Sequence, residues 1–173
     1  MEKEIVNRVA ESKLITFDLE DLYQPGERVI LDISQWLYEG LILREKEFRA
    51  QLEELDGFSY QDKYVALTCS SDAIVPGWAF MLVASKLVPF TKKVVQGDLE
   101  TLETALYQEA LSGYDFSDFE DKPIIIKGCS NKPVPQNAYL MAIAEIQKVA
   151  KSVMYGEACS AVPLFKKKRN PTR

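Results

Sequence analysis

Three cysteines, Cys69, Cys129 and Cys159, carry the most distinctive chemistry of this sequence, and each is followed by a serine. The charged start of the chain resembles no secretion signal, and an odd number of cysteines does not fit a disulfide framework, so we expect reduced thiols. Among metal groups, thiolates favour zinc and iron–sulfur clusters. The sequence contains no histidine, which excludes imidazole ligands, a histidine general base and any Cys-His or Ser-His catalytic pair.

The cysteines stand where parallel strands are expected to end. Cys69 directly follows an apolar run over residues 64–68, Cys129 comes shortly after a second run over 123–127, and Cys159 lies past the end of a later strand. Ligands of open α/β sheets bind beyond the carboxyl ends of the strands. The predicted metal site at this edge has five members, namely Cys69, Cys129, Cys159 and the acidic residues Asp98 and Glu157, which stand at matching positions after two strands.

Three functions remain open for these residues. In the first, the three thiolates and an oxygen ligand from a nearby carboxylate (Asp98, Glu157 or Asp72) or from water hold zinc or an iron–sulfur cluster. In the second, one thiolate, above all that of Cys129, is the nucleophile of a sulfur-transfer or acyl-transfer enzyme, at a helix N-terminus that lowers thiol pKa values. In the third, the cysteines are inert apolar residues of a structural or interaction domain.

Strands and helices alternate from about residue 62 onward, and this alternation predicts an α/β fold with a mostly parallel sheet and flanking helices. Strand-like runs occupy 64–68, 93–96, 123–127 and 152–155, the last of them stopped by Gly156. Helices are expected over 76–87, 99–111 (capped by Asp98) and 135–150. The helix over 76–87 is apolar on nearly all sides and should be well buried, whereas Glu100, Glu103 and Glu109 of the next helix should face water.

The first sixty residues are less regular and are assigned to the same domain. Strands are expected at 14–17 and 29–31, and an amphipathic helix at 44–55. The acidic-aromatic stretch 114–121 is interpreted as a linker. We therefore predict a single α/β domain over 1–173, with N-terminal strands and a covering helix in 1–60, a first β-α-β repeat in 62–112, a second in 121–163 and a basic tail in 166–173.

Two segments of the chain resemble each other at a separation of 59 residues. The matched pairs are Asp62-Lys63 with Asp121-Lys122, Val75-Pro76 with Val134-Pro135, Ala79 with Ala138, Lys92 with Lys151, Val94 with Val153, and Gly97 with Gly156. The two Cys-Ser dipeptides at 69 and 129 are 60 residues apart, so one loop is a residue longer. This many matches at one separation indicates an internal duplication of the β-α-β unit.

The composition excludes several classes of protein. No apolar run approaches the ~20 residues that span a bilayer. A net charge of −5 argues against nucleic acid as the main partner, although the last eight residues contain five basic side chains. No glycine-rich phosphate loop occurs, so no nucleotide is predicted. We expect a cytoplasmic protein, and we leave its oligomeric state open, a homodimer included.

Five runs of the sequence resemble a known family. They are LYEGLILREKEFR (37–49), YVALTCSSDAIVPGWAFMLVASKL (64–87), GDLETLETALYQEAL (97–111), KGCSNKPVPQNAYL (127–140) and YGEACSAVPLFKKK (155–168). They resemble an uncharacterised bacterial family that is known only as a domain of unknown function (2480), and the resemblance is specific at the three Cys-Ser dipeptides. It implies no established activity. Genes of that family tend to lie near genes of iron–sulfur cluster assembly, so the resemblance implies an accessory role there, with iron–sulfur assembly proteins as partners.

Overall fold

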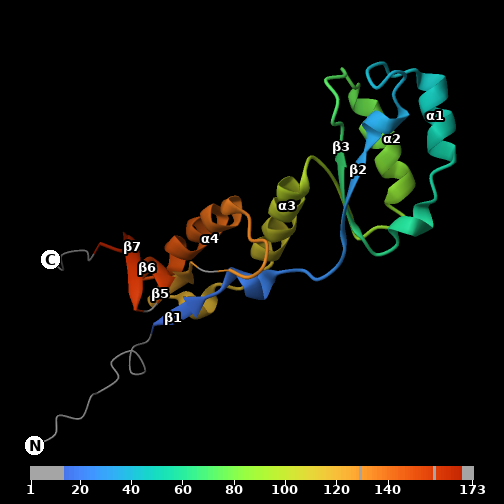
Figure 1. The fold of residues 1–173 in the computed structure, drawn as a ribbon. Coiled ribbons are helices and arrows are strands. Elements are labelled where there is room, and N and C mark those ends of the chain that lie inside the picture. The colour runs from blue at the N-terminus through green and yellow to red at the C-terminus, as the bar shows by residue number, and fades with distance from the viewer. Residues whose placement is uncertain (1–13, 129, 158, 169–173) are drawn as a thin grey trace, which may run out of the picture. The chain divides into compact units, whose positions relative to one another are not determined.

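The strands of the computed structural model are divided between two sheets, whereas the sequence predicted one. The structure describes residues 14–128, 130–157 and 159–168. Unit 1 comprises the chain up to Tyr23 and from Tyr107 onward, unit 2 comprises Gln24–Leu106, and each unit contains one sheet (Figure 1). The predicted α/β class with largely parallel strands is confirmed.

Unit 2 contains a sheet of three parallel strands in the order β2-β3-β4. These strands are β2 (Arg28–Asp32), β3 (Tyr64–Thr68) and β4 (Lys93–Gln96). Residues 64–67 of the central strand are all buried. A strand that is buried on both faces reads as a continuous apolar run, which is why the sequence YVALT located β3 correctly.

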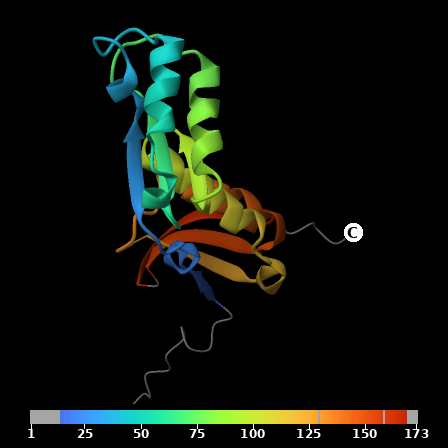
Figure 2. The ribbon, with the colours of Figure 1, turned by 90° about the vertical axis from the view of Figure 1, so that its right-hand side faces the viewer.

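Helices cover both faces of the unit 2 sheet. On one face, α1 (Glu45–Glu53) and α2 (Gly77–Leu87) lie side by side (Figure 2) and bury Phe48, Val83 and Leu87 against the strands. On the other face, Leu102 and Leu106 from the first part of α3 (Leu99–Ser112) pack against Tyr64 and Ala66 of β3. Because neighbouring residues of a strand point to opposite faces, the central strand contributes to both layers of the core.

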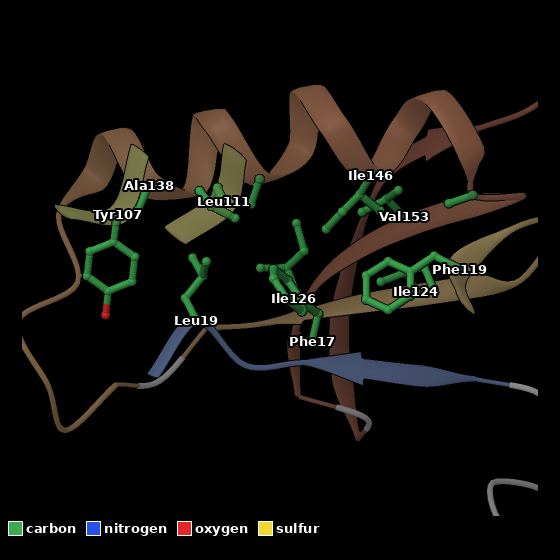
Figure 3. Close-up of a cluster of buried hydrophobic side chains, with 12 residues drawn as sticks. Phe17, Leu19, Tyr107, Leu111, Phe119, Ile124, Ile126, Ala138, Ile146 and Val153 are labelled. Atoms are coloured by element: carbon green, nitrogen blue, oxygen red, sulfur yellow. The ribbon is translucent and has the colours of Figure 1, made fainter. Parts of the chain in front are cut away.

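Unit 1 contains a sheet in the order β1-β5-β6-β7, in which the first three strands are parallel and β7 is antiparallel. The strands are β1 (Ile15–Phe17), β5 (Pro123–Lys127), β6 (Ser152–Glu157) and β7 (Ser160–Lys166). The helix α4 (Gln136–Val149) packs on this sheet. Figure 3 shows Ile146 of α4 directed toward Ile124, Ile126 and Val153 of the strands, all of which are fully buried.

Four short 3₁₀ helices connect these elements: η1 (Leu19–Leu22), η2 (Ile33–Trp36), η3 (Gly57–Tyr60) and η4 (Ser117–Phe119). Two of them follow edge strands: η1 begins after Asp18, which follows β1, and η2 directly follows β2. The helix η4 lies in the stretch that the sequence assigned to a linker. The aromatic ring of Phe119 in η4 is buried in the core of unit 1, so that stretch is part of the packed structure. Within the described ranges, no helix has both the length and the apolar character that crossing a membrane requires.

The C-terminal end of the unit 1 sheet differs from the prediction. Strand β6 does not stop at Gly156 but continues through it, with Gly156 at a φ of +126° that L side chains rarely adopt. The chain then turns and returns as β7, which the sequence did not predict. Pro163 within this run is typical of an edge strand, where a missing N–H costs no ladder hydrogen bond, and β7 lies at the edge of its sheet.

Two burial predictions are also wrong. The helix α2 is buried on one face only, and Met81 remains 68% exposed, because α1 and the sheet cover it from one side. Glu103 of α3 does not face water but is 6% exposed. Its carboxylate binds the guanidinium of Arg28 through two contacts, Nε–Oε1 at 2.6 Å and Nη2–Oε2 at 3.3 Å, and Arg28 also lies 4.9 Å from the ring centre of Tyr64.

Local geometry recurs at the separation at which the sequence repeats. Asp62 and Asp121 both have a positive φ, of 60° and 51°. The N–H of Asp62 donates to the carbonyl of Phe90, and the N–H of Asp121 donates to Val149, at 2.9 and 3.0 Å. The two units therefore share turn geometry at matched positions. A common origin of these units by duplication stays a prediction.

The Arg28–Glu103 pair yields a stability prediction. Replacement of Glu103 by Gln removes the negative charge that Arg28 binds, in a pair whose side chains are only 11% and 8% exposed. We expect the free energy of unfolding, measured by urea denaturation, to fall by about 3 kcal/mol. The double variant Arg28→Met/Glu103→Leu removes both charges and should recover most of that loss.

The matched control for this prediction is Glu45→Gln, which breaks an exposed i,i+4 pair with Arg49 on α1. Exposed pairs contribute about 0.5 kcal/mol or less. A loss for Glu103→Gln as small as that for Glu45→Gln would show that the buried pair does not hold α3 on the sheet.

Candidate functional site

Cys69 and Asp98 lie at the carboxyl ends of neighbouring strands of unit 2. Cys69 directly follows β3, is half-buried, and has its thiol sulfur 3.4 Å from the hydroxyl oxygen of Ser71. Asp98 follows β4 and caps α3, because its Oδ1 accepts from the N–H and the hydroxyl of Thr101 at 2.8 and 2.7 Å. The predicted cap is therefore confirmed, and one carboxylate oxygen of Asp98 is already used by the helix.

Asp32 fixes the loop that carries Cys69. Its Oδ1 accepts from the N–H of Ser34 at 2.9 Å and from the N–H of Ser70 at 3.1 Å. Burial would raise the pKa of Asp32, but the hydroxyl of Ser70 and the N–H groups of Ser34 and Ser70 donate to the carboxylate and lower it to about 2. The ionised carboxylate thus ties the end of β2 to the residue after Cys69.

At the corresponding edge of unit 1, a lysine lies among acidic residues. The Nζ of Lys127, the last residue of β5, binds Oδ2 of Asp18 at 2.5 Å, and Oδ1 of Asp18 accepts from the N–H of Glu20 at 2.9 Å. The hydrogen bond to Asp18 and the charges of Asp18, Glu20 and Glu157 raise the pKa of Lys127. Glu20 also accepts from the N–H of Asn131, so this carboxylate holds the loop after β5.

Glu157 and Cys159 lie together at this edge. Glu157 is the last residue of β6 and pairs with Ser160 at the start of β7, so Cys159 belongs to the turn between the two strands. Cys159 is exposed. The Oε1 atom of Glu157 is buried, and within residues 14–128, 130–157 and 159–168 it has no hydrogen-bond partner. A buried carboxylate oxygen without a partner is uncommon, because it loses its hydration without compensation.

Cys129 lies outside the described residues, but its chain neighbours do not. The N–H of Gly128 donates to the carbonyl of Gly156 at 3.3 Å, and the carbonyl of Gly128 accepts from the hydroxyl of Tyr155 at 3.3 Å. On the other side, the hydroxyl of Ser130 donates to the carbonyl of Lys132 at 2.8 Å. The residue before Cys129 therefore lies beside the end of β6, from which Glu157 and Cys159 follow.

Four of the five predicted ligands lie among the described residues, and they follow strands of two different sheets. Because β3 pairs with β2 and β4, whereas β5 pairs with β1 and β6, the strands that precede Cys69 and Cys129 belong to different sheets. Cys69 and Asp98 lie in unit 2, and Glu157 and Cys159 lie in unit 1. Asp72 is exposed in unit 2. In the part of the chain that the structure describes, no three Cys, Asp or Glu side chains lie close enough to hold a metal ion.

Sequence reasoning missed the residues that position these loops, namely Asp18, Glu20, Asp32 and Lys127. Asp18 and Asp32 share a signal that could have found them. Each directly follows a predicted strand and stands two residues before an N–H from which it can accept a hydrogen bond, which is the local pattern of an Asx turn. The partner Lys127 gives no such signal, because 109 residues separate it from Asp18.

The Asp32 carboxylate should make stability depend on pH in the acid range. Its folded pKa is lowered to about 2 from an ordinary 3.8, so its stabilisation is complete above the ordinary pKa and is lost as the pH falls from about 4 to about 2. We expect Asp32→Asn to lower the free energy of unfolding by about 1 kcal/mol at neutral pH. The difference from the wild type should shrink as the pH approaches 2, as measured by urea denaturation across this range.

Asp72→Asn is the matched control, since Asp72 is an exposed aspartate of the loop that carries Cys69. It should leave the acid dependence of stability unchanged. An Asp32→Asn protein with the same pH dependence as the wild type would contradict the role given to Asp32.

Comparison with known proteins agrees with the resemblance seen in the sequence. A family model described as a protein of unknown function (DUF2480) matches residues 3–167, which is nearly the whole chain and includes all three Cys-Ser dipeptides. No curated protein and no solved structure matches the chain. The chain therefore belongs to the DUF2480 family of proteins of unknown function.

Proposed function

We propose that this chain is a metal-binding protein, with a site at the carboxyl edge of the unit 1 sheet formed by Cys129, Cys159 and Glu157. The observation that carries the proposal is the buried Oε1 of Glu157, which has no hydrogen-bond partner among the described residues. A cation bound there would compensate the desolvation of this oxygen. The exposed thiol of Cys159 stands two residues further along the chain.

The path of the chain supports the inclusion of Cys129. Gly128, to which Cys129 is covalently joined, is hydrogen-bonded to Gly156, the residue before Glu157. Consecutive Cα atoms are about 3.8 Å apart. Gly128, the residue directly before Cys129, therefore lies at the same strand end as Glu157.

The charge at this edge also favours a cation. The negative charges of Asp18, Glu20 and Glu157 raise the pKa of Lys127. These four residues therefore comprise three carboxylates and one lysine. Two thiolates would add further negative charge when they lose their protons on binding a metal. Lys127 forms an ion pair with Asp18, and the charge of Glu157 also acts on it.

The donor set suits zinc, for which two thiolates, a carboxylate and a water molecule form an acceptable tetrahedral shell. A bound zinc ion would supply a cross-link between the loop after β5 and the turn after β6. An iron–sulfur cluster usually needs more thiolates. The accessory role in iron–sulfur cluster assembly rests on the family resemblance alone, and the site would then hold iron or a cluster in transit.

The proposal is tested by the metal content of protein purified anaerobically without added metal, measured by mass spectrometry for zinc and iron and by absorbance for a cluster. We expect about one ion per chain. Each of Cys129→Ser, Cys159→Ser and Glu157→Gln should lower the occupancy, because each removes a ligand. Circular dichroism confirms that each variant is folded.

Cys69→Ser is the matched control, because Cys69 lies after the equivalent strand of unit 2. It should leave the occupancy unchanged if the site is confined to unit 1. Wild-type protein that retains neither zinc nor iron in substantial amount would contradict metal binding. A loss in Cys69→Ser as large as that in Cys159→Ser would contradict a site built by unit 1 alone.

A further inference from the structure

Unit 1 contains a cavity that is separate from the proposed metal site. It has a volume of about 470 Å³ and lies between the C-terminal part of α3, the segment that follows it, and α4. Its apolar walls include Tyr114, Phe116 and Met141, and its polar lining includes Gln108 and Glu145. Cavities of small-molecule sites usually have about 300–1,000 Å³ and a mainly apolar lining with a few polar groups.

The aromatic wall of the cavity is held in place by further rings. The ring centres of Tyr114 and Phe116 are 4.8 Å apart. Both rings also contact Phe17 and Phe119 of the core at centre distances between 5.3 and 6.1 Å. The faces of aromatic rings carry partial negative charge and attract cations, and a fixed wall loses little conformational entropy on binding.

A helix C-terminus and a carboxylate contribute to the lining of this cavity. The last turn of α3, which contributes Gln108 to the lining, contains no basic residue to offset the negative end of the helix dipole. Glu145 adds a carboxylate from α4. Burial and the charges of Asp118, Asp21 and Asp115 raise the pKa of the Tyr114 hydroxyl, so the charges of three acidic side chains act on this ring's hydroxyl.

We propose that this cavity binds a small organic cation, in which an ammonium or guanidinium group is attached to an aromatic or aliphatic body. The body would fill the space between Tyr114, Phe116 and Met141, and the charged group would face Glu145 and the end of α3. This ligand chemistry follows from the combination of aromatic side chains, the Glu145 carboxylate and the C-terminal part of α3 in the lining of one cavity. It does not depend on the proposed metal site.

Glu145, which lines the cavity, already forms an ion pair with Lys148. The Nζ of Lys148 binds Oε2 of Glu145 at 2.6 Å, one turn along α4, and the two side chains are 60% and 44% exposed. Because the pair is exposed, its attraction is weak. A cationic ligand would compete with Lys148 for Glu145, so removal of Lys148 should strengthen binding.

Three probes that share one carbon skeleton isolate the effect of charge: 2-phenylethylammonium, 2-phenylethanol and phenylacetate. Binding to the full chain is followed by NMR, through the amide resonances of residues 108–116 and 141–145. We expect the cation to bind about tenfold more tightly than the alcohol and the anion to bind most weakly, with the cation's advantage decreasing as salt is added.

Variants assign the effect to the cavity. Glu145→Gln should weaken binding of the cation about threefold, and Lys148→Gln should strengthen it by a similar factor, while both leave binding of the alcohol unchanged. Ala144→Phe, which fills the cavity from α4, should abolish binding of both. Equal affinities for cation and alcohol, preference for the anion, shifts that map outside these residues, or no binding of the cation would each overturn the proposal.

Discussion

In each unit, an aspartate at the end of an edge strand is bound to the end of the central strand beside it. Asp18 pairs with Lys127 of β5, and Asp32 accepts from the N–H of Ser70 after β3. Each aspartate also accepts from the first turn of a 3₁₀ helix. A single carboxylate thereby fixes three segments of backbone at the edge where ligands of parallel sheets bind. Asp32 thereby holds the loop that carries Cys69, and Asp18 holds the end of the strand that precedes Cys129.

Local patterns in the sequence predicted the positions of most strands and helices. They could not predict which strands pair with each other across long stretches of sequence. Buried strands appear in a sequence as short apolar runs, so β3, β4 and β5 were predicted at the correct positions. The runs look alike whichever strand lies beside them, and the division into two sheets was therefore missed. Glu103 was expected in water because its buried partner, Arg28, lies 75 residues away. Strand β7 was missed because Pro163 interrupts its pattern.

The same limit applies to the candidate site. The sequence correctly placed Cys69 after a strand, Asp98 at the cap of a helix and Glu157 at a strand end. It joined them into one site because it assumed one sheet. In the structure, Cys69 and Asp98 belong to unit 2, and Glu157 and Cys159 belong to unit 1. The metal proposal uses Glu157 and Cys159 together with Cys129, which stands outside the described residues. The cavity proposed to bind a cation is lined in part by Tyr114 and Phe116, which belong to the stretch predicted to be a linker. Both aromatic residues pack against the core of unit 1.

The central claim is that sulfur and carboxylate ligands converge at the carboxyl edge of the unit 1 sheet. X-ray absorption at the edge of the metal that the protein retains tests it directly, because the fine structure reports ligand type and distance. The account predicts a shell of about two sulfur atoms at about 2.3 Å, completed by oxygen, for a zinc-loaded protein. A shell of oxygen or nitrogen alone would contradict it.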